Sequence, residues 1–317
     1  MNFNYGYACL NTLLRKKKIF SSRTCRISTI KAKGIEYIKE LSIKNLEDLL
    51  LILKWNVENK IYFMRVSSDI FPFASHPEYS YSLDFADELL KKIGQYARSN
   101  GIRLTMHPGQ YNVLSSPHSK VIQNTLKDLN HHCDILDRME LGVNSVIIIH
   151  GGGVYGNKNK ALERLEQNFF LLNECTQKRL VLENCEISYN VEDLLPISEK
   201  LQIPIILDFH HDDIFHSKES IDFYFDRVFK VWNNRGIKPK VHVSNSCPDV
   251  KPTDSKTARR KHSDYIYLLH DTLLKIQFPI DIMFEAKMKE QAVLRFREIS
   301  NKKFMSDTNK ATPETML

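Results

Sequence analysis

Short apolar runs rich in β-branched residues alternate along the chain with amphipathic stretches. Eight runs have the length and composition of buried strands: Asn4–Cys9, Ile61–Ser67, Arg103–His107, Ser145–His150, Leu180–Asn184, Pro204–Asp208, Lys240–Ser244 and Ile280–Glu285. Apolar residues at three- and four-residue spacing between the runs predict helices with one buried face. These helices cover Ile35–Asn56, Leu83–Ser99, Val121–Leu141, Ala161–Gln177, Val191–Leu201, Ser220–Asn233, Tyr265–Ile276 and Lys289–Ile299. Strands that alternate with helices indicate a parallel sheet with right-handed crossovers.

Eight strand–helix units predict an α/β fold, a single-domain (β/α)8 TIM barrel over residues 1–300. An open doubly wound sheet is the alternative, but it usually carries a glycine-rich phosphate loop after its first strand, and none follows Cys9 here. Gly151, Gly152 and Gly153 lack the required spacing. We therefore expect no nucleotide cofactor. Residues 301–317 are polar and aperiodic, which predicts a disordered tail.

The charge distribution favours a polyanionic partner. Lysine and arginine number 45 against 38 aspartate and glutamate residues, a net charge of +7. No acidic residue occurs before Glu36, whereas basic residues crowd Arg15–Lys33. This stretch fits an organelle transit peptide, a solvated loop without function, or a loop that contacts phosphates. Tyr5–Cys9 already resembles the first strand of the fold, which disfavours the transit peptide, and of the other two interpretations we prefer the loop that contacts phosphates.

The remaining composition indicates an intracellular protein without a membrane partner. The longest apolar runs, such as Val146–Ile149, are far too short to span a bilayer. None of the six cysteines forms a C-x-x-C pair, which is typical of a reducing compartment. Cys9 and Cys185 lie near predicted strand ends, where we expect buried structural cysteines. We also expect a monomer.

Histidine and acidic residues recur at the carboxyl ends of the predicted strands. They are His107, His150, Glu183, Asp208, His211, His242 and Glu285. Active sites of these barrels lie at this end, and charged groups at a buried rim are costly unless paired or bound to metal. Each residue alone fits a satisfied structural role, but the set at equivalent positions favours a metal cluster.

The ligand set indicates two or three divalent ions. It is too large for one tetrahedral ion, and mixed imidazole and carboxylate ligands suit manganese or zinc. His262, in the loop after the seventh strand, is a further candidate ligand. Lys240 faces the same way as His242, so it either needs a counter-charge or reaches solvent at the start of its strand.

Several motifs resemble those of the UV damage endonuclease family. The most specific is M-H-P-G-Q-Y at Met106–Tyr111, and R-V-S-S-D-I-F-P at Arg65–Pro72 runs on to Ser75 and His76. The first predicted strand gives G-Y-A-C-L-N at Gly6–Asn11. Shorter motifs follow in the family's order: Leu182–Asn184, Asp208–His211, Lys240–Ser244 and Met283–Lys287. The resemblance extends from Tyr5 to about Glu290.

The resemblance implies a barrel related to endonuclease IV and a set of site residues. The implied metal ligands are His107, His150, Glu183, Asp208, His211, His242, His262 and Glu285, with Glu183 between two ions. His76 matches an active-site histidine, and Lys240 matches a lysine that can be carboxylated to give an anionic ligand. Gln110 and Tyr111 match residues that wedge into the duplex at a lesion. Tyr7 and Asn11 match residues near the damaged nucleotides.

The resemblance therefore implies a metal-dependent DNA repair endonuclease that nicks damaged double-stranded DNA 5′ to UV photoproducts such as pyrimidine dimers. An abasic-site endonuclease of the endonuclease IV type shares the metals and differs in lesion. A sugar isomerase or epimerase also carries histidine and acidic residues at strand ends, but needs neither the Gln110–Tyr111 wedge nor the basic N-terminal stretch. A catalytically inactive DNA-binding barrel is disfavoured by the intact ligand set.

Overall fold

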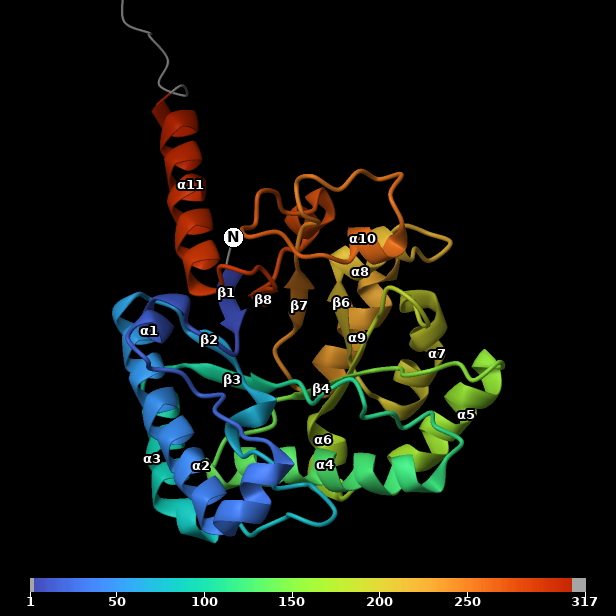
Figure 1. The fold of residues 1–317 in the computed structure, drawn as a ribbon. Helices are drawn as coiled ribbons and strands as arrows, with labels where there is room; N and C mark the ends of the chain where they lie inside the picture. Colours follow the sequence, from blue (N-terminus) through green and yellow to red (C-terminus); the bar gives the residue numbers. More distant parts are fainter. Residues whose placement is uncertain (1–2, 310–317) are drawn as a thin grey trace, which may run out of the picture.

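Eight parallel strands form a closed barrel in sequence order, with helices outside it (Figure 1). A computed structural model describes residues 3–309, with side chains as far as Ser300. The strands are β1 (Phe3–Ala8), β2 (Phe63–Val66), β3 (Arg103–Met106), β4 (Ile147–His150), β5 (Leu180–Glu183), β6 (Ile205–Asp208), β7 (Lys240–Val243) and β8 (Ile280–Phe284). The predicted (β/α)8 barrel is thus confirmed, and the observed strand ends lie within two residues of the predicted ones.

Barrel closure depends on the first and last strands, which lie side by side in Figure 1. β1 pairs with β8 from Phe3 opposite Ile280 to Tyr7 opposite Phe284. Every strand is short, and its apolar side chains are buried except for Phe3 and Tyr5 of β1, which are partly buried. Both faces of the strands are covered, one by the barrel interior and the other by the surrounding helices.

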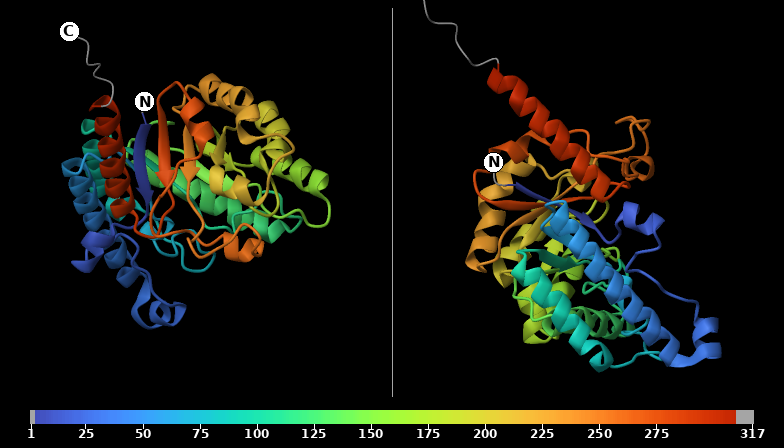
Figure 2. Two further views of the ribbon diagram at one scale, coloured as in Figure 1. Left: turned by 90° about the horizontal axis from the view of Figure 1, so that it is seen from above. Right: turned by 90° about the vertical axis from the view of Figure 1, so that its left-hand side faces the viewer.

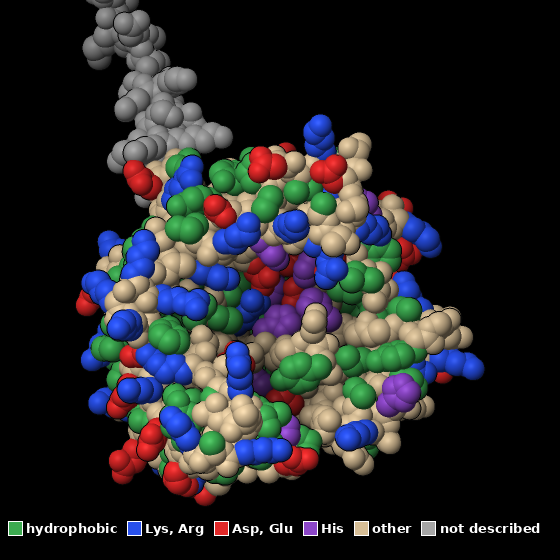
Figure 3. All heavy atoms as spheres, in the orientation of Figure 1, with side chains coloured by type: hydrophobic (Ala, Val, Ile, Leu, Met, Phe, Trp, Pro, Cys, Tyr) green, Lys and Arg blue, Asp and Glu red, His purple; other side chains and the backbone are tan. Residues whose placement is uncertain are grey.

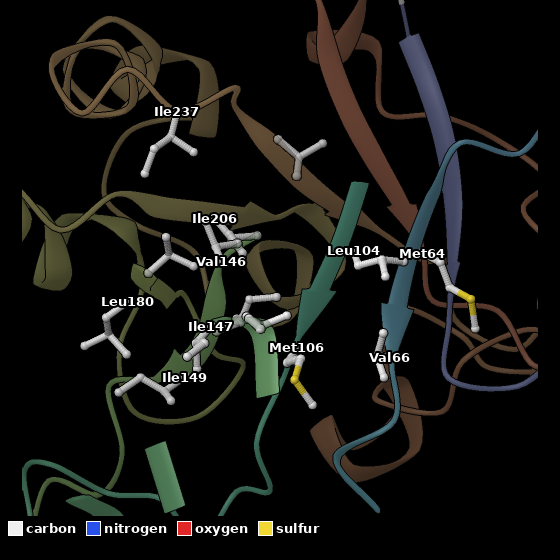
Figure 4. Packing of buried hydrophobic residues seen from close by; sticks show 14 of the residues in the cluster. Met64, Val66, Leu104, Met106, Val146, Ile147, Ile149, Leu180, Ile206 and Ile237 are labelled. Carbon is white, nitrogen blue, oxygen red and sulfur yellow. The ribbon is translucent and has the colours of Figure 1, made fainter. Parts of the chain in front are cut away.

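The core between strands and helices is apolar and close-packed. Figure 4 shows Met64 and Val66 of β2, Leu104 and Met106 of β3, and Ile147 of β4 within it. None of these side chains is more than 1% exposed. Full burial of one such side chain stabilises the fold by roughly 1.5–3 kcal/mol relative to leaving it in water. The strands therefore form a rigid base for the loops at their carboxyl ends.

The helices connect successive strands. They are α1 (Thr12–Lys16), α2 (Ile27–Glu58), α3 (Asp87–Ser99), α4 (Ser119–Arg138), α5 (Lys158–Phe169), α6 (Glu174–Arg179), α7 (Val191–Leu201), α8 (Phe209–Ile214), α9 (Phe225–Asn234), α10 (Lys256–Arg259) and α11 (Glu290–Asn309). Short 3-10 turns complete the connections: η1 (Ser68–Ile70), η2 (Asp84–Ala86), η3 (Ile221–Tyr224) and η4 (Asp271–Lys275). No helix within residues 3–309 is long and apolar enough to cross a membrane.

Local sequence signals explain where several helices begin. α7 starts at its predicted residue, because Asn190 and Asp193 form a reciprocal capping box. α2 starts earlier than predicted but is broken at Gly34, whose φ of 78° is outside the helical region. The main part of α2 therefore begins at the expected Ile35, and the preceding turns project from the body of the protein (Figure 2).

The helix predicted over Tyr265–Ile276 is wrong. Only the 3-10 turn η4 forms there, and His270, which we expected to be helical, precedes that turn. The amide of Tyr267 donates instead to the side-chain oxygen of Asn245 at 2.8 Å. The three- and four-residue spacing of apolar residues in this segment therefore does not mark a helix face. It arises because an irregular loop buries single apolar side chains.

Two other predicted helices have different bounds. The segment Ala161–Gln177 is divided into α5 and α6, because the side chain of Asn173 accepts from the amide of Thr176 and starts a new helix. α11 continues ten residues beyond the predicted Ile299, to Asn309. The rest of the predicted tail, residues 310–317, lies outside the described residues.

Candidate metal centre

Seven of the predicted ligands meet at the carboxyl end of the barrel. Strand register explains this: His150 pairs with Glu183, and Asp208 pairs with His242, so neighbouring strands present their polar residues at one level. His107 and Glu285 directly follow β3 and β8, and His211 lies in α8. Figure 3 shows histidine and acidic side chains at the bottom of a hollow, with lysine and arginine side chains around it.

The ligand atoms form three groups, within each of which they lie within 4.8 Å of one another. The groups are His107, His150 and Glu183; Glu183, Asp208 and His211; and Asp208, His242 and Glu285. Glu183 belongs to the first and second groups, and Asp208 to the second and third. The arrangement is therefore a connected series of three candidate sites.

The carboxylate of Glu183 lies close to three of the histidine ligands. One carboxylate oxygen lies 3.0 Å from His107 Nε2, and the other lies 2.9 Å from His242 Nδ1 and 3.5 Å from His211 Nδ1. Its side chain is only 1% exposed. Each oxygen thus faces a different part of the centre, which is the geometry that a bridging ligand needs.

Asn184 holds the second group in position. Its side-chain oxygen accepts from the Asp208 amide at 2.8 Å, and its side-chain nitrogen donates to the Asp208 carbonyl at 2.9 Å. The carbonyl of Asn184 lies 2.9 Å from His211 Nδ1. Asp208 in turn accepts from the His211 amide at 2.8 Å. These hydrogen bonds fix the orientation of Asp208 and His211 before any ion binds.

Three atoms of the ligand residues are buried without a hydrogen-bond partner: His150 Nδ1, Asp208 Oδ2 and His242 Nε2. A buried polar atom left unpaired costs about 1–3 kcal/mol. Lone pairs on imidazole nitrogen and carboxylate oxygen are donors to divalent cations. The residues present therefore fit a metal cluster, and coordination would satisfy Asp208 Oδ2, which the protein alone leaves unpaired and which lies 3.6 Å from His211 Nδ1.

The ionisation of the cluster also fits a cation. Burial lowers the pKa of His150 and His242 to about 4, so both imidazoles are neutral near pH 7, the form that binds metal. Burial raises the pKa of Asp208 to about 8. Burial would lower the pKa of His211, but the carboxylates of Asp208 and Glu183 outweigh it and raise this pKa to about 10. The isolated protein thus holds protons that a divalent cation would displace.

Lys240 is fully buried inside the barrel, beneath the ligands. Its Nζ lies 3.5 Å from Thr105 Oγ1 and 5.2 Å from the Phe63 ring centroid. Burial, followed by the positive charges of Arg103 and Arg65, lowers the pKa of Lys240 well below its usual value. The side chain does not reach solvent, so that explanation of Lys240 is wrong.

Two predicted site residues lie outside the three groups. His262 Nδ1 lies 2.6 Å from Ser244 Oγ, and its ring centroid is 5.3 Å from that of His210. His76 follows β2 in the chain; its Nδ1 accepts from the Glu78 amide at 3.1 Å. Its ring is half-buried. Neither is a ligand within 4.8 Å of the other ligand atoms in the described part of the chain.

Gln110 and Tyr111 lie at the tip of the loop after β3. Both are exposed, with Tyr111 at 66%. Behind them Asn112 anchors the loop, because its side chain donates to Asp128 Oδ2 at 2.7 Å and to the Gly109 carbonyl at 3.0 Å. Gln110 also lines a hollow of about 190 Å³ next to the first ligand group. The loop therefore holds an exposed aromatic ring beside the candidate centre.

Tyr7 and Asn11 lie inside the protein at the connection between β1 and α1. Both are fully buried. Tyr7 Oη donates to Asn56 Oδ1 at 2.7 Å, and Asn11 caps α1 by accepting from the Leu14 amide at 2.9 Å. Both side chains secure the start of α1, and their place near the damaged nucleotides stays a prediction.

Some basic side chains of the N-terminal segment are exposed to solvent, whereas others form ion pairs within the protein. α1 follows β1 at the same end of the barrel as the ligands, and Arg15, Lys16, Lys17 and Lys18 are exposed there. Arg23, by contrast, lies 2.6 Å from Asp48 and donates to the Lys18 carbonyl at 2.9 Å. Its guanidinium holds the loop and is not available to a phosphate.

The sequence patterns did not predict the charged residues that pair with the candidate ligands or lie beside them. Arg65 of β2 forms a 2.5 Å ion pair with Glu285. Burial lowers the pKa of Arg65, but Glu285 outweighs it and raises this pKa above its usual range. Glu186 pairs with Arg260 at 2.5 Å and lies 3.6 Å from His211. Arg65 belongs to a recognised motif, whereas nothing in the spacing of Glu186 and Arg260 indicated their meeting.

Comparisons with known proteins agree with this geometry. Residues 3–313 match the family model described as UV-endonuclease UvdE. The chain is 42% identical to the UV-damage endonuclease of Schizosaccharomyces pombe, over 91% of this chain and 49% of that protein. The chain thus spans about half the length of this fungal relative. It is 35% identical to the UV DNA damage endonuclease of Clostridium perfringens, over 92% of this chain and 69% of that protein.

A solved structure extends the comparison to the fold. The crystal structure of SacUVDE superposes with a TM-score of 0.82 at 31% identity, covering 95% of this chain and 98% of that chain. Sequence, family model and barrel geometry agree over nearly the whole length. This chain belongs to the UV-endonuclease UvdE family.

Proposed function

We propose that the protein is a DNA repair endonuclease that nicks the phosphodiester backbone 5′ to UV photoproducts, using a multi-metal cluster. The observation that carries the proposal is the series of three ligand groups, joined through Glu183 and Asp208, in a member of the UvdE family. We further propose that it acts inside the cell, as a monomer, on damaged double-stranded DNA.

Two or three divalent ions, manganese or alternatively zinc, would supply Lewis-acid stabilisation of phosphate charge and activation of water. Glu183 would set the spacing of two sites through its two oxygens. Arg65 holds Glu285 by the 2.5 Å ion pair, so this carboxylate stays ionised and directed into the third group. His150 and His242 supply neutral nitrogen ligands, because burial keeps the pKa of both near 4.

Lys240 and His76 complete the proposed catalytic residues. Burial lowers the pKa of Lys240 and so favours the uncharged amine, the form that reacts with carbon dioxide; carboxylation would give an anionic oxygen ligand below the centre. His76 lies apart from the ligand groups, with a half-buried ring in the connection after β2. We assign it a contact with the substrate; it is not placed as a ligand within these groups. His262, whose Nδ1 lies 2.6 Å from Ser244 Oγ, remains a proposed ligand.

Substrate recognition is assigned to the exposed loop after β3. The ring of Tyr111 can stack where damaged nucleotides leave the helix, and Gln110 can fill the remaining gap. A photoproduct stacks and pairs poorly, so moving it out of the duplex costs less than moving intact nucleotides. Damage is then detected through deformability of the duplex. The exposed charges Arg15–Lys18 would contact phosphates beside it.

The test is a nicking assay with three supercoiled plasmids: UV-irradiated, abasic and intact. With manganese present, we expect nicking of the irradiated plasmid well above that of the intact one. Preference for the abasic plasmid would instead identify an abasic-site endonuclease. No nicking of any plasmid, together with turnover of a ketose by the same preparation, would identify a sugar epimerase or isomerase.

A further inference from the structure

A second cluster of reactive groups lies between α4 and α6, away from the ligand groups. Cys133 of α4 and Cys175 of α6 have their sulfur atoms 3.1 Å apart. Both sulfurs face Asp137 Oδ2, at 3.5 Å from Cys133 and 2.8 Å from Cys175. α4 ends and α6 leads directly into β5 at the amino ends of the strands, opposite the candidate metal centre. The proposed function makes no use of this cluster.

We propose that Cys133 and Cys175 form a reversible disulfide by exchange with a small-molecule disulfide, and that this bond joins α4 to α6. A disulfide has a sulfur–sulfur distance of about 2.05 Å, so the two atoms need to approach by only about 1 Å. α6 has six residues and is preceded by a short turn. A small shift of its first turn is therefore enough, and the barrel strands need not move.

The exposure of the two thiols fixes the order of the reaction. Cys133 is 1% exposed, whereas Cys175 is only partly buried. The Cys175 thiolate attacks the small-molecule disulfide, forms a mixed disulfide and releases one thiolate. The Cys133 thiolate then attacks Cys175 Sγ and releases the second. Two protein thiols are oxidised, one small-molecule disulfide is reduced to two thiols, and the two protons pass to the departing thiolates.

A metal site is the main alternative, because Cys133, Asp137 and Cys175 offer three ligand atoms. Two features favour the disulfide. Sulfurs that share one tetrahedral zinc at about 2.3 Å would stand about 3.8 Å apart, farther than the 3.1 Å observed. In addition, Asp137 Oδ1 lies 2.6 Å from the buried guanidinium of Arg179, whose positive charge opposes a cation at this position.

Arg179 makes the cluster rigid and so keeps the sulfurs together. Its guanidinium donates to the carbonyls of Gly142 at 2.7 Å and Leu141 at 2.5 Å, besides its ion pair with Asp137. A bond between Cys133 and Cys175 would close a long loop of the chain between α4 and α6. Constraint of the unfolded chain should raise the melting temperature by roughly 5 °C.

The test uses the full chain and no DNA, so its outcome is independent of the proposed nicking activity. The protein is incubated with glutathione disulfide or with dithiothreitol, and its thiols are then counted in denaturant. We expect the oxidised protein to show two fewer thiols than the six of the sequence. Non-reducing peptide mapping should recover the Cys133 and Cys175 peptides joined, and dithiothreitol should restore both thiols and the lower melting temperature.

Matched variants separate this pair from the other cysteines. Cys175→Ser and Cys133→Ser should lose the oxidant-dependent rise in melting temperature, whereas Cys25→Ser should keep it. Peptide mapping of the unmodified chain makes the result independent of how well the variants fold. A mixed disulfide on Cys175 that never resolves, a different linked pair, or zinc retained through Cys133 and Cys175 would each overturn the proposal.

Discussion

Replacement of Glu183 by glutamine is the sharpest perturbation of the proposed centre. The change keeps the size of the side chain and removes its charge. Glu183 belongs to two of the three ligand groups, so the variant retains only the group of Asp208, His242 and Glu285 intact. We therefore expect bound metal to fall by up to two ions per chain.

The expected loss of activity follows from the same count. Metal ions stabilise transition-state charge by several kcal/mol, and about 4 kcal/mol corresponds to a factor of about one thousand in rate. Glu183→Gln should therefore nick UV-irradiated DNA at least about a thousandfold more slowly. Metal content is measured by elemental analysis of protein loaded with manganese and desalted, and nicking by conversion of supercoiled plasmid.

Glu290→Gln is the matched control. Glu290 is also fully buried, but its carboxylate accepts from the Thr12 and Leu13 amides at 2.7 and 2.9 Å and belongs to none of the ligand groups. Its loss should lower the melting temperature and leave the metal content unchanged. Full metal content and normal nicking in Glu183→Gln would refute the reasoning.

Three further predictions address recognition and stability. The double variant Gln110→Ala, Tyr111→Ala should keep its metals and melting temperature and lose at least about tenfold of its preference for damaged over intact duplex, because stacking contributes roughly 1–3 kcal/mol per base. Neutralising Arg15–Lys18 should weaken binding to both duplexes and reduce the slope of log K against log salt by roughly one unit for each phosphate that is no longer bound. Chelated protein should become less stable to urea as pH falls from about 6.5 to about 4, because the folded state keeps three buried histidines neutral: His150, His210 and His242.

Each of these predictions has a control and a contrary outcome. An unchanged damaged-to-intact ratio with a lower melting temperature would make Tyr111 a packing residue. Lys91→Gln with Lys92→Gln, on exposed positions of α3, should leave the salt slope unchanged. For the acid effect, Asp208 and Asp212 act in the opposite direction, since burial raises their pKa to about 8 and about 6, which favours the folded state as pH falls. Three histidines outweigh two carboxyls, so a urea midpoint that is flat or rises on acidification would contradict the argument.

The barrel was predictable because most of its strands are short apolar runs that pack on both faces. Strand ends matched within two residues for the same reason. The failure over Tyr265–Ile276 has a local cause: the Asn245 side chain accepts from the Tyr267 amide, and such a long-range contact leaves no trace in apolar spacing. Intrinsic patterns predict regular elements well and irregular loops poorly.

The ligand set was predictable for a topological reason. Parallel strands bring their carboxyl ends to one face, so residues at strand ends, such as Glu183 and Asp208, meet whatever their separation in sequence. Loop residues have no such rule, and the pairing of Glu186 with Arg260 was therefore not foreseen. The burial of Tyr7 depends on packing against α2, which the strand pattern alone did not reveal.

The central claim is tested most directly by mapping the cut on an end-labelled duplex that carries one pyrimidine dimer. With manganese, the account predicts a single nick on the damaged strand, immediately 5′ to the dimer, and none on the matched undamaged duplex. Chelation should abolish the nick, and added manganese should restore it. A cut on the 3′ side, equal cutting of the undamaged duplex, or full activity in the chelated protein would contradict the account.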